Sequence, residues 1–217
     1  MIARSRRTCG LPLRTVFGVL LALGFAGCST APPQPPIEHA LAVSAEQGNP
    51  RAQVDLGIRM LAQAHTPEER ATAVKWIRSA ADANLALGQA RLGWMYLTGK
   101  GVPQDTSRAL KWLRLAANRG APAAQLQLAQ IYATGTLVPL DKAQAYYWYS
   151  VAAKPARSDV TIFNIVQVRF FAQMRAQSLA DSLTAAQKQS VGEQVAAWAP
   201  AASVPYSAAV SLKSFMR

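Results

Sequence analysis

Residues 92–105 read LGWMYLTGKGVPQD, and this stretch has a counterpart 36 residues earlier and another 36 residues later. The interval is clearest in three tryptophans, Trp76, Trp112 and Trp148. Four further columns keep the same spacing without any insertion: Leu56, Leu92 and Leu128; Gln53, Gln89 and Gln125; Pro67, Pro103 and Pro139; and the Ala-Ala pairs that begin at Ala80, Ala116 and Ala152. A fixed period of this length indicates stacked copies of one supersecondary unit. The sequence therefore predicts a solenoid with three 36-residue repeats over residues 48–156.

Each repeat contains two helical patterns. The first places small or apolar residues at Gly88, Leu92, Gly93 and Tyr96 in copy two, and the second places them at Ala109, Trp112, Leu113 and Ala116. Both are the stripes of amphipathic helices, so the predicted fold is an all-α solenoid of helix pairs. The small residue after each leucine lets a neighbouring helix approach closely. We expect the tryptophan column to fill that space as part of the core.

The N-terminus predicts export. Residues 1–27 hold four arginines before the apolar run from Val16 to Ala26, which is typical of a secretory signal and too short for a membrane-spanning helix. The following Ala26-Gly27-Cys28 resembles a bacterial lipobox, although Phe25 departs from its usual leucine. The resemblance implies an acylated Cys28, and Ser29 after it favours the outer membrane over the inner one. We therefore expect a periplasmic protein that is anchored to a membrane by lipid.

The segments that flank the repeats have roles of their own. The proline-rich residues 28–36 predict an extended tether, because consecutive prolines favour polyproline II. Residues 37–47 align with the end of a repeat and predict an N-terminal capping helix. Residues 200–217, rich in proline, serine and alanine, are expected to be a mobile tail.

Residues 157–199 predict a helical hairpin that caps the C-terminal end of the solenoid, where an open end would expose core. Its first helix is expected from Ser158 to about Ala180, and its second from the capping box at Thr184 to Trp198. In the first of these helices four apolar residues fall along one face: Phe163, Val166, Phe170 and Met174.

The charge of the chain argues against nucleic acid. The formal net charge is +12, and removal of the first 27 residues leaves 19 basic and 11 acidic residues, a net charge of +8. After Cys28 no two basic residues are adjacent. Charge spread in this way is typical of a solvated surface, so no nucleic-acid partner is predicted. Attraction to anionic envelope surfaces stays open.

Three segments of copy two carry a family resemblance. LGWMYLTGKGVPQD at 92–105, ALKW at 109–112 and AANRG at 116–120 resemble the Sel1-like repeat, an α/α solenoid related to the tetratricopeptide repeat. The resemblance covers residues 48–153. It implies a protein–protein adaptor, in roles such as signalling, host contact, envelope assembly or exopolysaccharide export.

The sequence offers little catalytic chemistry. Only His39 and His65 are histidines, and Cys28 is the one cysteine that follows the signal. Neither His-Glu-x-x-His nor Gly-x-Ser-x-Gly occurs. The glycines of residues 93–101 do not have the spacing of a phosphate-binding loop. We therefore predict no catalytic residue, no metal and no cofactor.

Residues at positions that differ between the repeats are not fixed by packing and are therefore available to contact a partner. In related solenoids the first helix of each pair lines the concave surface, so its outward positions predict the binding residues: Arg51, Asp55 and Ile58 in copy one, Arg91 and Trp94 in copy two, and Gln127 and Gln130 in copy three. Trp94 is the expected anchor, because aromatic residues beside arginine are common hot spots. The alternative is that these are ordinary solvent-facing positions.

Tyr147 is a second departure from the repeat, since it occupies the column of Lys75 and Lys111. It has two interpretations: packing against the helix expected at 159–180, or contact with an external partner.

The leading hypothesis is a lipid-anchored periplasmic adaptor without enzymatic activity that binds another envelope protein on its concave face. The alternative is a protein associated with peptidoglycan or polysaccharide through basic and aromatic residues. A third hypothesis is a β-lactamase-like hydrolase, an activity that has been claimed for cysteine-rich relatives. This chain lacks those cysteines and any acid–base constellation.

Overall fold

The computed structural model describes residues 36–154 and 162–201, which form nine α-helices and no strand. The predicted signal, Cys28, nearly all of the tether, Ser158 and the tail beyond Ala201 lie outside the described residues. In chain order the helices are α1 Pro36–Glu46, α2 Pro50–Gln63, α3 Pro67–Asp82, α4 Ala86–Thr98, α5 Thr106–Asn118, α6 Pro122–Thr134, α7 Lys142–Ala153, α8 Ile162–Ala180 and α9 Ala185–Ala197.

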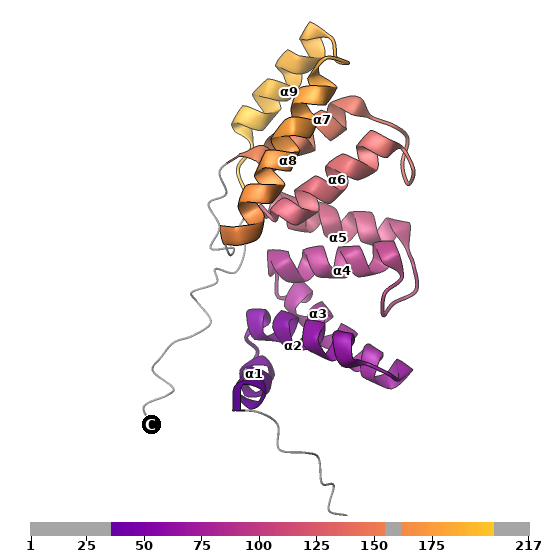
Figure 1. Cartoon of the computed structure of the whole chain (residues 1–217), viewed down its shortest axis with the longest axis vertical. Coiled ribbons are helices and arrows are strands. Elements are labelled where there is room, and N and C mark those ends of the chain that lie inside the picture. The colour runs from indigo at the N-terminus through magenta and orange to yellow at the C-terminus, as the bar shows by residue number, and fades with distance from the viewer. Residues whose placement is uncertain (1–35, 155–161, 202–217) are drawn as a thin grey trace, which may run out of the picture. The chain divides into compact units, whose positions relative to one another are not determined.

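The helices pack as antiparallel pairs that stack in chain order (Figure 1). The closest pairs are α2 with α3, α4 with α5, and α6 with α7, and α3 packs on α4 as α5 does on α6. At the N-terminal end α1 covers α2, and at the C-terminal end α8 and α9 both pack against α7. The predicted all-α solenoid with a C-terminal helical cap is confirmed.

Side-chain caps begin the second helix of each pair. The carboxylates of Asp105 and Asp141 each accept a hydrogen bond of 2.9 Å from a backbone N–H in the first turn of α5 and α7. Thr66 opens α3 with a capping box, and Thr184 opens α9 in the same way. The capping box at Thr184 is one that the sequence predicted, and capping depends on residues within one turn of each other.

The residue after each tryptophan, rather than the tryptophan, fills the space between the paired helices. Ile77 and Leu113 are 0% exposed and Tyr149 is 3% exposed. Among the tryptophans only Trp148 is buried, whereas Trp76 and Trp112 are partly exposed. The close approach itself is confirmed, because a Cβ added to Gly93 would lie 2.9 Å from Cγ of Leu113. The expectation that the whole tryptophan column is core is wrong, since a large indole does not fit where the two helices come closest.

The glutamine column ties each repeat to the element before it. Gln53, Gln89 and Gln125 are buried, and their side-chain amides donate hydrogen bonds of 3.2, 3.1 and 3.0 Å to the carbonyl oxygens of Ala45, Ala81 and Ala117. Each of these carbonyls lies in the last turn of a helix and also accepts a hydrogen bond of 3.0 Å from the backbone N–H three residues later, that of Gly48, Asn84 or Gly120. The repeated glutamine therefore adds a second hydrogen bond, which joins the end of one helix to the next unit.

Two arginine–tyrosine hydrogen bonds cross the same boundaries. Nη2 of Arg78 donates to the hydroxyl of Tyr96 at 3.0 Å, and Nη2 of Arg114 donates to the hydroxyl of Tyr132 at 2.8 Å. Each arginine lies on a second helix and each tyrosine on the first helix of the next repeat. Successive repeats are thus joined by polar links as well as by the apolar core.

The predicted apolar face of α8 is exposed. Val166, Phe170 and Met174 are 61%, 66% and 59% exposed, whereas Ala172 and Ala176 are buried. The side chain of Phe163 lies outside the described residues. Helix α8 packs on α7, and its Ala172 and Ala176 belong to the core cluster that contains Tyr149 and Val151 of α7. In the described part of the chain no helix is both long and apolar enough to cross a membrane.

Candidate partner-binding surface

The seven predicted binding residues lie on the first helices of the three repeats, α2, α4 and α6, which are labelled in Figure 1. They are Arg51, Asp55 and Ile58 on α2, Arg91 and Trp94 on α4, and Gln127 and Gln130 on α6. None of them is fully buried, and α2 and α4 are in contact. The structure therefore leaves all seven side chains at least partly accessible.

On α2, two of the predicted residues interact with each other. Nε of Arg51 lies 3.2 Å from a carboxylate oxygen of Asp55, one helical turn away. A pair of this kind on a helix surface contributes about 0.3–0.5 kcal/mol to stability. Both charges have a partner within the helix.

On α4, Trp94 combines an apolar contact with two cations. One side of the indole packs, together with Ile58 and Leu97, against the apolar cluster around Ile77 and Leu92. The guanidinium of Arg91 lies 5.6 Å from the ring centroid, and Nζ of Lys100 lies 5.0 Å from it. Both distances are within the range of cation–π attraction.

Neither Arg91 nor Lys100 forms an ion pair with a carboxylate among the described residues. Arg91 is half-buried, and the loss of solvent lowers the pKa of its guanidinium. Within residues 36–154 and 162–201 the ion pairs join Arg51 to Asp55 and Arg108 to Asp105, and no carboxylate there pairs with Arg91 or Lys100. We define the cationic tryptophan cluster as Arg91, Trp94 and Lys100.

Lys100 was missed by sequence reasoning. It lies six residues after Trp94, beyond the end of α4, so helical spacing does not place the two together. The chain turns back at Gly99, which has a φ of 72° and ends the helix. The only sequence signal was the glycine on either side of Lys100, which marks a tight reversal.

On α6, the predicted positions carry neutral amides. Gln127 is partly exposed and Gln130 is exposed. Cationic and aromatic side chains are therefore concentrated in the second repeat, and the third repeat contributes hydrogen-bonding groups at the matching positions.

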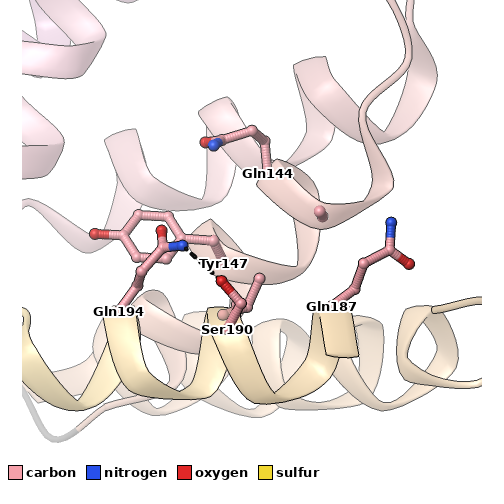
Figure 2. A pocket seen from close by; sticks show the side chains of 7 residues that line it. Gln144, Tyr147, Gln187, Ser190 and Gln194 are labelled. Atoms are coloured by element: carbon pink, nitrogen blue, oxygen red, sulfur yellow. Dashed lines mark hydrogen bonds between the residues drawn. The ribbon is translucent and has the colours of Figure 1, made fainter. Parts of the chain in front are cut away.

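Tyr147 faces α9 (Figure 2). Its ring is partly buried and makes an edge contact with Trp148, with 4.9 Å between ring centroids, and burial raises the pKa of its hydroxyl. It lines a pocket whose other side chains come from α7 and α9: Ala143, Gln144, Gln187, Ser190, Val191 and Gln194. The helix expected at 159–180 does not line this pocket, because α9 returns along α7.

Within the described residues, no group of three His, Cys, Asp or Glu side chains is arranged to hold a metal ion. His39 and His65 are both exposed and lie on separate elements.

Comparison with known proteins identifies the repeats. The Sel1 repeat family model matches residues 50–85, 86–120 and 122–154. A solved Sel1 repeat protein from Oxalobacter formigenes is 33% identical, with a TM-score of 0.51, and the match covers 64% of this chain and 96% of that one. The chain belongs to the Sel1 repeat family. A search of curated proteins finds no match.

A second similar solved structure is that of a longer protein. The protective antigen c5321 of uropathogenic Escherichia coli, which displays an SLR fold, is 34% identical with a TM-score of 0.59. The match covers 73% of this chain but 31% of the antigen, so the present chain spans about a third of its length. Sel1 repeat proteins are generally protein-interaction scaffolds. In the present chain the three matched ranges begin at the first residues of α2, α4 and α6.

Proposed function

We propose that this Sel1 repeat protein is an exported, lipid-anchored scaffold that binds a protein of the cell envelope. The partner contacts the surface formed by the outward positions of α2, α4 and α6. The observation that carries this proposal is the cationic tryptophan cluster: a partly exposed indole with two cations at 5.0–5.6 Å that have no carboxylate partner in the described chain.

Comparison of the repeats supports a role in binding rather than in packing. The positions of Arg91, Trp94 and Lys100 are occupied by Asp55, Ile58 and Ala64 in copy one and by Gln127, Gln130 and Thr136 in copy three. The solenoid packs in the same way in all three copies without a second such cluster. Tryptophan and arginine are also enriched among residues that dominate binding energy at protein interfaces.

Photocrosslinking in cells tests the binding surface. A photoreactive amino acid replaces Thr98, which is exposed at the end of α4, or Lys111, which is exposed on α5. We expect a defined protein adduct from position 98, no such adduct from position 111, and loss of the adduct in Trp94→Ala. An adduct from position 98 that survives Trp94→Ala would contradict the proposal.

The lipid anchor rests on Ala26-Gly27-Cys28 and has its own test. Cys28→Ser removes the thiol that acylation needs, so the protein should move from the membrane fraction to the soluble periplasmic fraction. Cys9→Ser, within the signal, is the matched control and should leave the protein in the membrane fraction.

A second candidate function is association with peptidoglycan. The pocket lined by Tyr147, Gln144, Gln187, Ser190 and Gln194 offers an aromatic ring with amides and a hydroxyl, which are groups that suit uncharged sugars. Pelleting with isolated peptidoglycan separates the two functions. If Tyr147→Ala abolishes pelleting and Trp94→Ala leaves every protein adduct in place, peptidoglycan association is supported and the scaffold proposal is wrong.

A further inference from the structure

We infer that the partner segment bound at the cationic tryptophan cluster is acidic, with an aspartate or glutamate beside an apolar side chain. The carboxylate contacts Arg91 and Lys100, and the apolar side chain packs against Trp94 and Ile58. The inference rests on the proposed function, because it names the chemistry of the partner at that same surface.

The charge of the cluster is uncompensated within the described chain. Two cations lie near one indole, at 5.6 and 5.0 Å from its centroid. Asp105, the acidic residue nearest Lys100 in sequence, pairs with Arg108 at 3.2 Å, and Asp55, which occupies the column of Arg91 in the first repeat, pairs with Arg51 at 3.2 Å. An external carboxylate is therefore the group that this surface lacks.

Partial burial makes Arg91 a good partner for a carboxylate. Its guanidinium has already lost part of its hydration, so less solvent has to be removed when an ion pair forms. The planar guanidinium can also bind both oxygens of one carboxylate at once. The flexible side chain of Lys100, just beyond the end of the helix, can move to contact the same carboxylate. Lys100 is exposed and free to move in this way.

The apolar side of the cluster limits the partner further. Trp94, Ile58 and Leu97 are partly exposed and lie over the same buried cluster. A segment with acidic residues alone leaves this area in contact with water. An acidic residue next to a leucine, isoleucine or methionine covers it, so the surface fits an acidic amphipathic segment of a protein.

A peptide-display selection tests the inference on the full-length protein in detergent. The chain is compared with the double variant Arg91→Gln/Lys100→Gln, with Trp94→Ala, and with Lys75→Gln/Lys111→Gln. The last variant removes the same charge from exposed positions on α3 and α5. Circular dichroism melting curves confirm that each variant is folded before the selection.

We expect peptides selected on the unaltered chain to be enriched in Asp and Glu, and this enrichment to be lost on Arg91→Gln/Lys100→Gln and retained on Lys75→Gln/Lys111→Gln. By fluorescence anisotropy, the best peptide should bind about tenfold more weakly when its acidic residues become amides or when Arg91 and Lys100 are both Gln. Binding should also weaken as salt increases.

Three results overturn the inference, and they separate it from the proposed function. Peptides that bind without acidic residues and are lost on Trp94→Ala leave the scaffold surface in place but contradict an acidic partner. Peptides that bind equally well to Trp94→Ala contradict both. Displacement of the peptide by peptidoglycan fragments of equal affinity assigns the bound carboxylate to peptidoglycan and contradicts a protein partner.

Discussion

The side-chain amide of Gln89 donates a hydrogen bond of 3.1 Å to the carbonyl oxygen of Ala81, across the boundary between the first and second repeats. The same bond joins Gln53 to Ala45 and Gln125 to Ala117. These bonds explain why glutamine, a polar residue, keeps the 36-residue period as strictly as leucine does. The glutamine recurs because each helix pair ends in a carbonyl that accepts one local backbone N–H and a second hydrogen bond from the next pair.

Replacement of this glutamine should destabilise the solenoid. In Gln89→Leu the carbonyl of Ala81 loses the glutamine amide but keeps the backbone N–H of Asn84 at 3.0 Å, so the loss of this hydrogen bond should cost about 0.5–1.5 kcal/mol of unfolding free energy. Arg119 also loses its bond to Oε1 of Gln89, which is 3.3 Å long. Urea denaturation followed by circular dichroism measures the loss.

Gln53→Leu is the matched comparison. No donor among the described residues reaches the buried Oε1 of Gln53, so this substitution removes an unsatisfied acceptor along with the useful amide. It should therefore cost less than Gln89→Leu. Equal losses would show that the acceptor side of the glutamine has no effect on stability.

Two glycine-to-alanine substitutions should change the free energy of unfolding in opposite directions. A Cβ at Gly57 would lie 2.6 Å from Cγ1 of Ile77 and 2.9 Å from the backbone oxygen of Ala73, so Gly57→Ala forces the paired helices apart at a cost of about 1–3 kcal/mol. A Cβ at Gly192 in α9 would meet nothing within 4 Å. Gly192→Ala should stabilise the protein by up to about 1 kcal/mol, since alanine favours helix. Thermal unfolding distinguishes the two, and stabilisation by Gly57→Ala would contradict the close packing.

The exposed face of α8 makes a prediction that runs against its sequence pattern. Phe170 is 66% exposed, so Phe170→Ser should change the unfolding free energy by no more than about 0.5 kcal/mol. Ala172 is 0% exposed, and Ala172→Leu should overpack the contact with α7 and cost about 1–3 kcal/mol. Denaturant unfolding of both variants checks the prediction. A large loss in Phe170→Ser alone would mean that this face is covered in solution.

The capping box of α3 should give the protein an acid-sensitive contribution to stability. Oε2 of Glu69 accepts hydrogen bonds from the backbone N–H groups of His65 at 2.7 Å and Thr66 at 3.1 Å, and these bonds, chiefly that of His65, lower the pKa of the carboxyl from its usual 4.5. A carboxyl with a lowered pKa in the folded state stabilises the fold above pH 4.5, and this contribution is lost as the pH falls through the lowered pKa.

Glu69→Gln tests this contribution, because glutamine still accepts the hydrogen bonds but carries no charge. The difference in melting temperature from the unaltered chain should be greatest above pH 4.5 and should shrink as the pH falls below it. Glu68→Gln, at the neighbouring exposed position, is the control. A difference that does not change with pH would contradict the role of the charge.

The sequence by itself determined the repeat, the helix pairs and their caps. A 36-residue period is visible in any column that packing keeps constant, and a cap such as Asp105 or Thr184 depends on residues within one turn of each other. The sequence also showed that Trp94 differs from the residues at the matching positions of the other two repeats.

Only the tertiary structure decided which side of each pattern is buried. Trp76 and Ile77 are both apolar and adjacent in sequence, and the closeness of the facing helix selects Ile77 for the core. Likewise Phe170 is exposed, whereas Ala172 on the other side of α8 joins the core cluster that contains residues of α7. Lys100 reaches the ring of Trp94 because the chain reverses at Gly99. Burial and charge depend on how closely separate helices approach, and helical periodicity carries no information about that distance.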